Sequence, residues 1–218
     1  MPNWCSNNIQ IHGPKTQLKK LLKDMEAVPP DADADDDEAE VRLVNLLPMP
    51  DSLRGTRSPS PSGAFDPDGE LLKLVIDDDN EHWTTETYAE RKAEHDTLVA
   101  KSLKAKAETG YDNWYDWANE IWGTKWGDCE TNIDLNEKDK YNDVTYVSGW
   151  YETAWGPFEA DFWIKVSQEY PKLKFAIGYV EEGMNFRGAD TYHDGECLFS
   201  QEDEVDRLWQ LAVEEAKA

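Results

Sequence analysis

The chain has 218 residues, and its 46 Asp and Glu against 22 Lys and Arg give a formal net charge of −24. Such a charge repels phosphate backbones and anionic membranes, which argues against nucleic acid or membrane partners and favours basic ones. A hydrophobic content of 39% with ten Trp is enough for a packed core, so the chain is not a disordered acidic tail. It lacks both an apolar run of about 18 residues and a secretion signal, which predicts a cytoplasmic protein.

The first elements are a strand, a helix and an acidic loop. Residues 3–12 alternate as a strand whose inward face begins with Cys5, and Pro14 suits the first turn of a helix that spans 14–27. Residues 28–40 are dense in Asp and Glu without a cation, which is typical of a solvated loop.

The middle of the chain differs from the rest in composition. Residues 41–50 are predicted to be a short extended segment, and 54–69 form a linker rich in Ser, Pro and Gly. The pattern from 83 to 108 is helical and highly charged, and 110–126 places aromatic residues at helical spacing.

The last third alternates between strands and helices. Strands are predicted at 128–135, with Cys129 inside and Asp128 outside, and at 144–153. A helix at 157–170 and a strand at 172–180 follow.

Two less regular segments end the chain. Residues 183–199 are predicted to be a loop with one or two short strands, and Ser200 is predicted to cap a final helix.

The strands and helices predicted within 3–27 and 128–180 follow the order βαββαβ, which is that of a ferredoxin-like α+β sandwich. The predicted core is formed by residues 1–27 and 127–200. Residues 28–126 are then a large, partly helical insertion, and 201–218 form a C-terminal helix.

No signature of catalysis, of a cofactor or of a metal is present. Four scattered His, no Gly-rich phosphate loop and no nucleophile elbow predict a protein that is not an enzyme and needs no cofactor or metal. Three Cys without a CxxC pair, one of them Cys197, indicate reduced thiols. The segment DTYHDGE (190–196) gathers acidic groups but lacks the spacing of a calcium loop.

The Trp residues are interleaved with Asp and Glu rather than with Lys and Arg, as in YDNWYDW (111–117). Stacking platforms for single-stranded nucleic acid carry basic neighbours, so packing of the insertion onto the sheet is the favoured interpretation.

Four motifs carry a family resemblance: PNWCSN, NLLPMP, YDWANEIWGTKW and WYETAWGPF. With them the chain resembles the Api92-like proteins of phages and plasmids, a family of unknown function with a ferredoxin-like C-terminal part. The resemblance implies an origin on a mobile element and a fold, but it transfers no catalytic residue. The Asp run at 28–40 departs from the family pattern.

We therefore expect an acidic accessory protein that binds and inhibits a basic host protein, such as a nuclease or another DNA-processing or defence enzyme, by DNA mimicry. The carboxylates predicted to bind this partner are Asp31, Asp33, Asp35, Asp36, Asp37, Glu38, Glu40, Asp77, Asp78, Asp79, Glu81, Asp128, Glu130 and Asp134.

Two alternatives stay open. One is an enzyme that handles a small ligand or nucleotide in a pocket between the sheet and the Trp-rich insertion, lined by Trp126, Trp155 and His193. The other is a structural or regulatory subunit whose acidity serves only solubility or adaptation to salt.

Overall fold

The computed structural model describes residues 3–27, 40–60, 85–137, 144–202 and 208–218. The chain divides into two compact units: Met1–Pro48 together with Ala118–Ala218, and Met49–Trp117. Each unit is described by itself.

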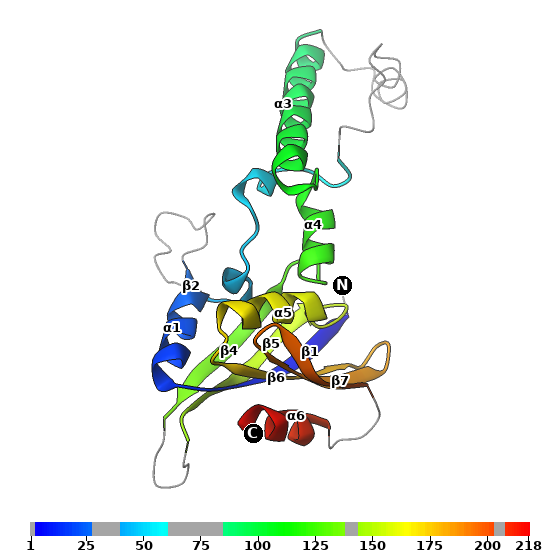
Figure 1. Ribbon diagram of the computed structural model, residues 1–218. Coiled ribbons are helices and arrows are strands. Elements are labelled where there is room, and N and C mark those ends of the chain that lie inside the picture. The colour runs from blue at the N-terminus through cyan, green and yellow to red at the C-terminus, as the bar shows by residue number, and fades with distance from the viewer. Residues whose placement is uncertain (1–2, 28–39, 61–84, 138–143, 203–207) are drawn as a thin grey trace. The chain divides into compact units, whose positions relative to one another are not determined.

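The first unit contains a six-stranded antiparallel sheet (Figure 1). Its strands lie in the order β4-β5-β1-β6-β7-β8, and neighbouring strands are all antiparallel. The strands are β1 (Trp4–His12), β4 (Asp128–Asn136), β5 (Tyr146–Ala154), β6 (Lys174–Glu181), β7 (Phe186–His193) and β8 (Glu196–Glu202).

The chain order β1, α1, β4, β5, α5, β6 confirms the predicted ferredoxin-like α+β fold. β1 lies between β5 and β6, and β4 lies outside β5, so that the first and second core strands are separated by the third. β7, β8 and a last helix extend this core on the β6 side.

Two helices cover one face of the sheet, and a third lies on the opposite face (Figure 1). The first two are α1 (Lys15–Met25), which buries Leu18, Leu21 and Met25, and α5 (Ala160–Glu169), which buries Phe162 and Trp163. The alternation of β1 sends Cys5, Asn7, Ile9 and Ile11 into this layer, as predicted.

On the opposite face, the described residues of the first unit place one helix, over β6 and β7. Helix α6 (Leu208–Lys217) packs with Ala212 and Val213 on Ala176 of β6 and Ala189 of β7. The Oγ1 of Thr191 donates a hydrogen bond of 2.9 Å to the carbonyl of Ala212 and fixes the helix on β7.

The predicted faces of β4 are wrong at its start. Asp128 was expected outside and Cys129 inside, but Asp128 is fully buried and Cys129 is exposed. The cause is a β-bulge between Asp128 and Thr131, which shifts the alternation along this strand.

Several predicted bounds also change. The segment predicted as extended at 41–50 contains β3 (Glu40–Val41), which pairs with β2 (Glu26–Ala27), and the short 3-10 helix η1 (Leu43–Leu46). Residues 183–199, predicted as mostly loop, form most of β7 and β8. Ser200 lies within β8 and caps no helix.

The second unit is mainly helical. It contains η2 (Asp51–Leu53), the 25-residue helix α3 (Thr85–Thr109) and the start of α4 (Trp114–Ile121). Inside it, the Thr56 Oγ1 accepts a hydrogen bond of 2.9 Å from the amide of Trp114.

His12 makes the stability of the first unit depend on pH. Its ring stacks on Tyr146 with centroids 5.5 Å apart, and burial together with the nearby Lys217 lowers the pKa of His12 from 6.5 to about 4. The folded state therefore keeps His12 neutral, whereas the unfolded chain takes up a proton as the pH falls below 6.5.

We expect unfolding free energy to fall between about pH 6.5 and pH 4, by on the order of 3 kcal/mol at most, since one pKa unit corresponds to about 1.36 kcal/mol. Urea unfolding at a series of pH values measures this slope. His12→Gln should flatten it, and an unchanged slope in that variant would assign the pH dependence to other groups.

Candidate functional site

The uncovered part of the sheet forms the first candidate surface. It is the side of β4, β5 and β1 that faces away from α1 and α5, and we call this side the open face. It consists of Ser6, Asn8, Glu130, Asn132, Asp134, Ser148, Trp150 and Glu152.

Trp150 lies at the centre of the open face. Its side chain is 43% exposed, and the residues paired with it on the two flanking strands are Asn8 and Asn132. A further aromatic pair lies at the start of β1, where the rings of Trp4 and Trp126 have centroids 6.5 Å apart and both side chains are largely exposed. An exposed aromatic ring on a sheet is a stacking surface for a planar or cationic group.

The open face carries carboxylates without cations. Glu130 and Asp134 are exposed and Glu152 is half-buried. Within the part of the chain that the structure describes, no Lys, Arg or His nitrogen lies within 4.0 Å of these three carboxylates. At the other end of β4, by contrast, Glu137 is paired with Lys15 at 2.7 Å. The open face is therefore acidic as well as aromatic.

The predicted acidic residues other than Asp128 fall into three groups. Glu130 and Asp134 lie on the open face, and Glu40 begins β3. The remaining acidic residues of 31–38 and of 77–81 lie outside the described residues.

Asp128 does not belong to an acidic surface, so that prediction is wrong. It is fully buried, and its Oδ2 and Oδ1 accept hydrogen bonds from the amides of Leu43 (2.9 Å) and Val44 (3.0 Å). The Thr131 Oγ1 donates a third hydrogen bond of 2.6 Å to Oδ2. The carboxylate thus anchors η1 to β4 and has a structural role.

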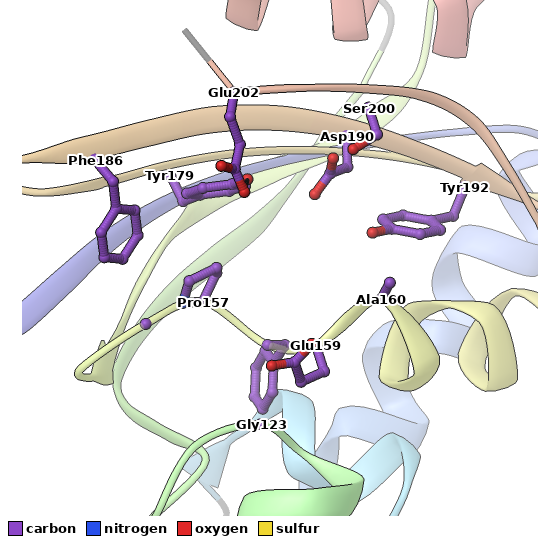
Figure 2. A pocket seen from close by; sticks show the side chains of 12 residues that line it. Gly123, Pro157, Glu159, Ala160, Tyr179, Phe186, Asp190, Tyr192, Ser200 and Glu202 are labelled. Carbon is purple, nitrogen blue, oxygen red and sulfur yellow. Dashed lines mark hydrogen bonds between the residues drawn. The ribbon is translucent and has the colours of Figure 1, made fainter. Parts of the chain in front are cut away.

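The second candidate is a cavity of about 500 Å³ between the sheet and the segment that leads into α5 (Figure 2). Strands β6, β7 and β8 supply one wall, and residues 156–160 with Gly123 supply the other. Figure 2 shows Tyr179, Asp190, Tyr192 and Glu202 extending from the strands toward that segment. Its volume lies within the range of small-ligand sites.

Asp190 is the most perturbed acid in the cavity. Burial raises the pKa of its carboxyl group, and Glu202 raises it further, whereas the hydroxyls of Ser200 and Tyr192 lower it. Its Oδ1 is buried and has no hydrogen-bond partner in the described structure. A buried acceptor of this kind costs free energy unless a donor reaches it.

The aromatic residues of the cavity are held in place by close packing. Any side chain at Gly188 would collide with the phenol of Tyr179, because a Cβ there would lie 2.3 Å from its oxygen. Glycine therefore lets the ring of Tyr179 cross β7 toward Glu202, with 3.5 Å between Oη and Oε1. Phe186 contacts the same ring at a centroid distance of 6.3 Å.

The three residues predicted to share a pocket do not line this cavity. Trp126 and Trp155 are 39% and 49% exposed, and His193 lies at the end of β7, with its Nδ1 3.1 Å from the carbonyl of Leu173. Sequence reasoning named Asp190 and Tyr192 only within the DTYHDGE segment and missed Tyr179 and Glu202. The usable signal was alternation: Asp190 and Tyr192 are two residues apart, as are Ser200 and Glu202, so each pair shares a face.

The thiols give no sign of reactivity. Burial raises the pKa of Cys5 to about 12, and it also raises the pKa of Cys129 and of Cys197. All three cysteines are free. Raised values leave little thiolate at neutral pH, so none of them is an activated nucleophile.

Over the described ranges, no group of three or more His, Cys, Asp or Glu side chains is arranged to hold a metal ion. Within the same ranges, no helix has the length and apolar character needed to cross a membrane.

The order of the elements and of the strands in the sheet defines a ferredoxin-like α+β protein. Residues 132–216 match the family model described as "Ferredoxin-like domain in Api92-like protein". The predicted resemblance to Api92-like proteins is thereby confirmed for this part of the chain.

A solved structure shows the same fold. The crystal structure of the protein Api92 from Yersinia pseudotuberculosis is 13% identical, covers 94% of this chain and 99% of its own, and has a TM-score of 0.51. At this identity the likeness concerns the fold alone. No curated protein matches the sequence. Neither matching description names an activity.

Proposed function

We propose that this protein is a non-enzymatic interaction protein of a phage or plasmid that binds and inhibits a basic host protein. The partner is a DNA-processing or defence enzyme in the host cytoplasm, whose basic groove accepts carboxylates in place of phosphates. The observation that carries the proposal is the open face, where Glu130, Asp134 and Glu152 lie without cations on a chain of net charge −24.

Uncompensated carboxylates of one sign steer a basic partner toward the face that carries them. Trp150 adds an exposed ring at the centre of that face, on which an arginine guanidinium of the partner can stack. The same carboxylates disfavour nucleic acid, because stacking proteins need basic residues to hold the backbone.

The test combines affinity capture with charge neutralisation. The tagged full chain is incubated with bacterial host lysate at about 0.05 M and about 0.5 M salt, across which electrostatic screening rises steeply. We expect DNA-binding proteins to be retained at low salt, released at high salt and displaced by added DNA. Mass spectrometry identifies them.

A matched pair of variants locates the surface. Glu130→Gln, Asp134→Asn and Glu152→Gln together should reduce the captured basic protein at least tenfold. The control combines Glu182→Gln, Glu196→Gln and Glu214→Gln, which removes the same charge from exposed positions outside the open face. Equal capture by both triple variants would refute the open face as the binding surface, and an empty capture by the unaltered chain would refute the proposed function.

A second candidate is supported by the cavity of about 500 Å³ beside α5, which has the size of a small-ligand site. This differs from the predicted pocket, because it is lined by Asp190, Tyr179 and Tyr192 rather than by the exposed Trp residues.

A further inference from the structure

We propose that the cavity beside α5 binds an organic cation, an alkylammonium or guanidinium group, between aromatic rings and carboxylates. This rests on the second candidate function above and names its ligand class, and the site is separate from the open face, since it lies on the other side of the sheet.

The chemistry of the lining residues favours a cation. The cavity residues include three acidic side chains and no Lys, Arg or His, and the acidic ones are Glu159, Asp190 and Glu202. They come from three elements: the segment before α5, β7 and β8. A cationic ligand would thus meet carboxylates on both walls of the cavity.

The aromatic residues complete a site for a cation with apolar parts. Tyr179, Phe186, Tyr192 and Phe158 line the same space. Ring faces attract ammonium and guanidinium groups and also accept the methylene chain that carries them. An inorganic cation would need oxygen ligands at coordination distance, and no such group of three exists among the described residues.

Asp190 supplies the specific partner. Its Oδ1 is buried without a donor, so an N–H of the ligand would satisfy it with a charge-assisted hydrogen bond. The phenol of Tyr179 donates a hydrogen bond of 3.5 Å to Oε1 of Glu202. Figure 2 shows both carboxylates directed into the cavity.

The N-terminus of α5 is a feature that would favour an anion instead. It lies beside the cavity at Ala160, where unpaired amides carry partial positive charge. However, the N-cap residue is Glu159 and the first turn contains Asp161, so negative side chains already offset this charge.

The probe is agmatine, which carries a guanidinium and an ammonium on a four-carbon chain, titrated into the full protein by isothermal calorimetry at about 0.15 M salt. We expect one-to-one binding. 1,4-Diaminobutane should also bind, and 1,4-butanediol, which has the same length but no charge, should not. Equal binding of the diol would overturn the proposal, as would no binding of agmatine.

Variants tie the binding to the cavity. Asp190→Asn should weaken agmatine at least tenfold, and Glu202→Gln, at the exposed end of β8, at least threefold. Glu214→Gln removes one charge from an exposed position of α6, on the opposite face of the sheet, and should leave agmatine affinity unchanged. Unchanged affinity in both cavity variants would show diffuse attraction to an acidic protein and overturn the site.

A third probe distinguishes the source of the cation. N-acetyl-arginine methylamide binding as well as agmatine would indicate a side chain of a protein partner, and selective binding of the free diamines would indicate a small metabolite. The open-face variants do not alter the cavity. Loss of partner capture therefore tests the proposed function, and loss of agmatine binding tests the cation site, each without the other.

Discussion

Replacing Asp128 by Ala should lower the unfolding free energy by about 3 to 5 kcal/mol, because each buried donor left without an acceptor costs about 1 to 3 kcal/mol. The side chain accepts hydrogen bonds from the amides of Leu43 and Val44 and from the Thr131 hydroxyl. Leu43 is itself fully buried, so water does not readily replace these acceptors. Urea unfolding with linear extrapolation measures the loss.

The matched control is Asp134→Ala, six residues further along the same strand and exposed. It removes the same charge and should change stability by no more than about 0.5 kcal/mol, as is usual for surface positions. Asp128→Asn keeps one carbonyl oxygen and should lie between the two. Similar losses for Asp128→Ala and Asp134→Ala would show that the buried hydrogen bonds contribute little.

Asp128 also shows where sequence reasoning fails. Alternation along 128–135 predicts Asp128 outside, and this is the usual place for an acidic residue. A single bulge reverses the alternation, and bulges leave no reliable trace in one sequence. The backbone amides that bind Asp128 lie 84 and 85 residues away, beyond the range of any local pattern.

The fold itself was predictable, because its core elements carry clear periodicity. The alternation of Cys5, Asn7, Ile9 and Ile11 and the helical spacing of Leu18 and Leu21 led directly to β1 and α1. The extent of the strands in 183–199 was underestimated. β8 is an edge strand whose residues are mostly exposed, so it lacks the alternation of buried and exposed positions that identifies a strand.

The candidate sites were less predictable. Open-face residues Glu130 and Asp134 follow from strand alternation, but the absence of neighbouring cations depends on how β4, β5 and β1 are paired. The cavity depends on the register of β7 with β8, which brings Asp190 opposite Ser200 and Gly188 opposite Glu202. This register is set when the sheet folds, so the sequence alone does not predict which residues face each other across β7 and β8.

The largest loss from a single core substitution should come from Trp163→Ala. Its side chain is 1% exposed and contacts four rings, those of Phe158, Phe162, Phe175 and Tyr192, at centroid distances of 6.0, 5.0, 5.9 and 6.4 Å. Truncation of a buried Trp to Ala costs about 3 to 5 kcal/mol, since it removes apolar contacts and leaves a void. Urea or thermal unfolding measures this change.

Trp163→Phe separates the ring from its polar atom. The Nε1 of Trp163 is buried without a hydrogen-bond partner in the described structure, so Phe removes an unsatisfied donor while keeping an aromatic ring. We expect a loss of about 1 to 2 kcal/mol, well below that of Ala, because part of the volume remains filled. A loss as large as that of Ala would mean that the indole, rather than aromatic packing, is required.

The same pair of variants connects the core to the cavity. Phe158 and Tyr192 contact Trp163 on one side and line the cavity on the other, so a void at Trp163 gives both rings room to shift. Trp163→Ala should therefore weaken agmatine binding even at temperatures where the variant stays folded, whereas Trp163→Phe should retain most of the affinity. If both variants bound agmatine like the unaltered chain, the aromatic wall would be irrelevant to recognition, and the carboxylates alone would account for the binding.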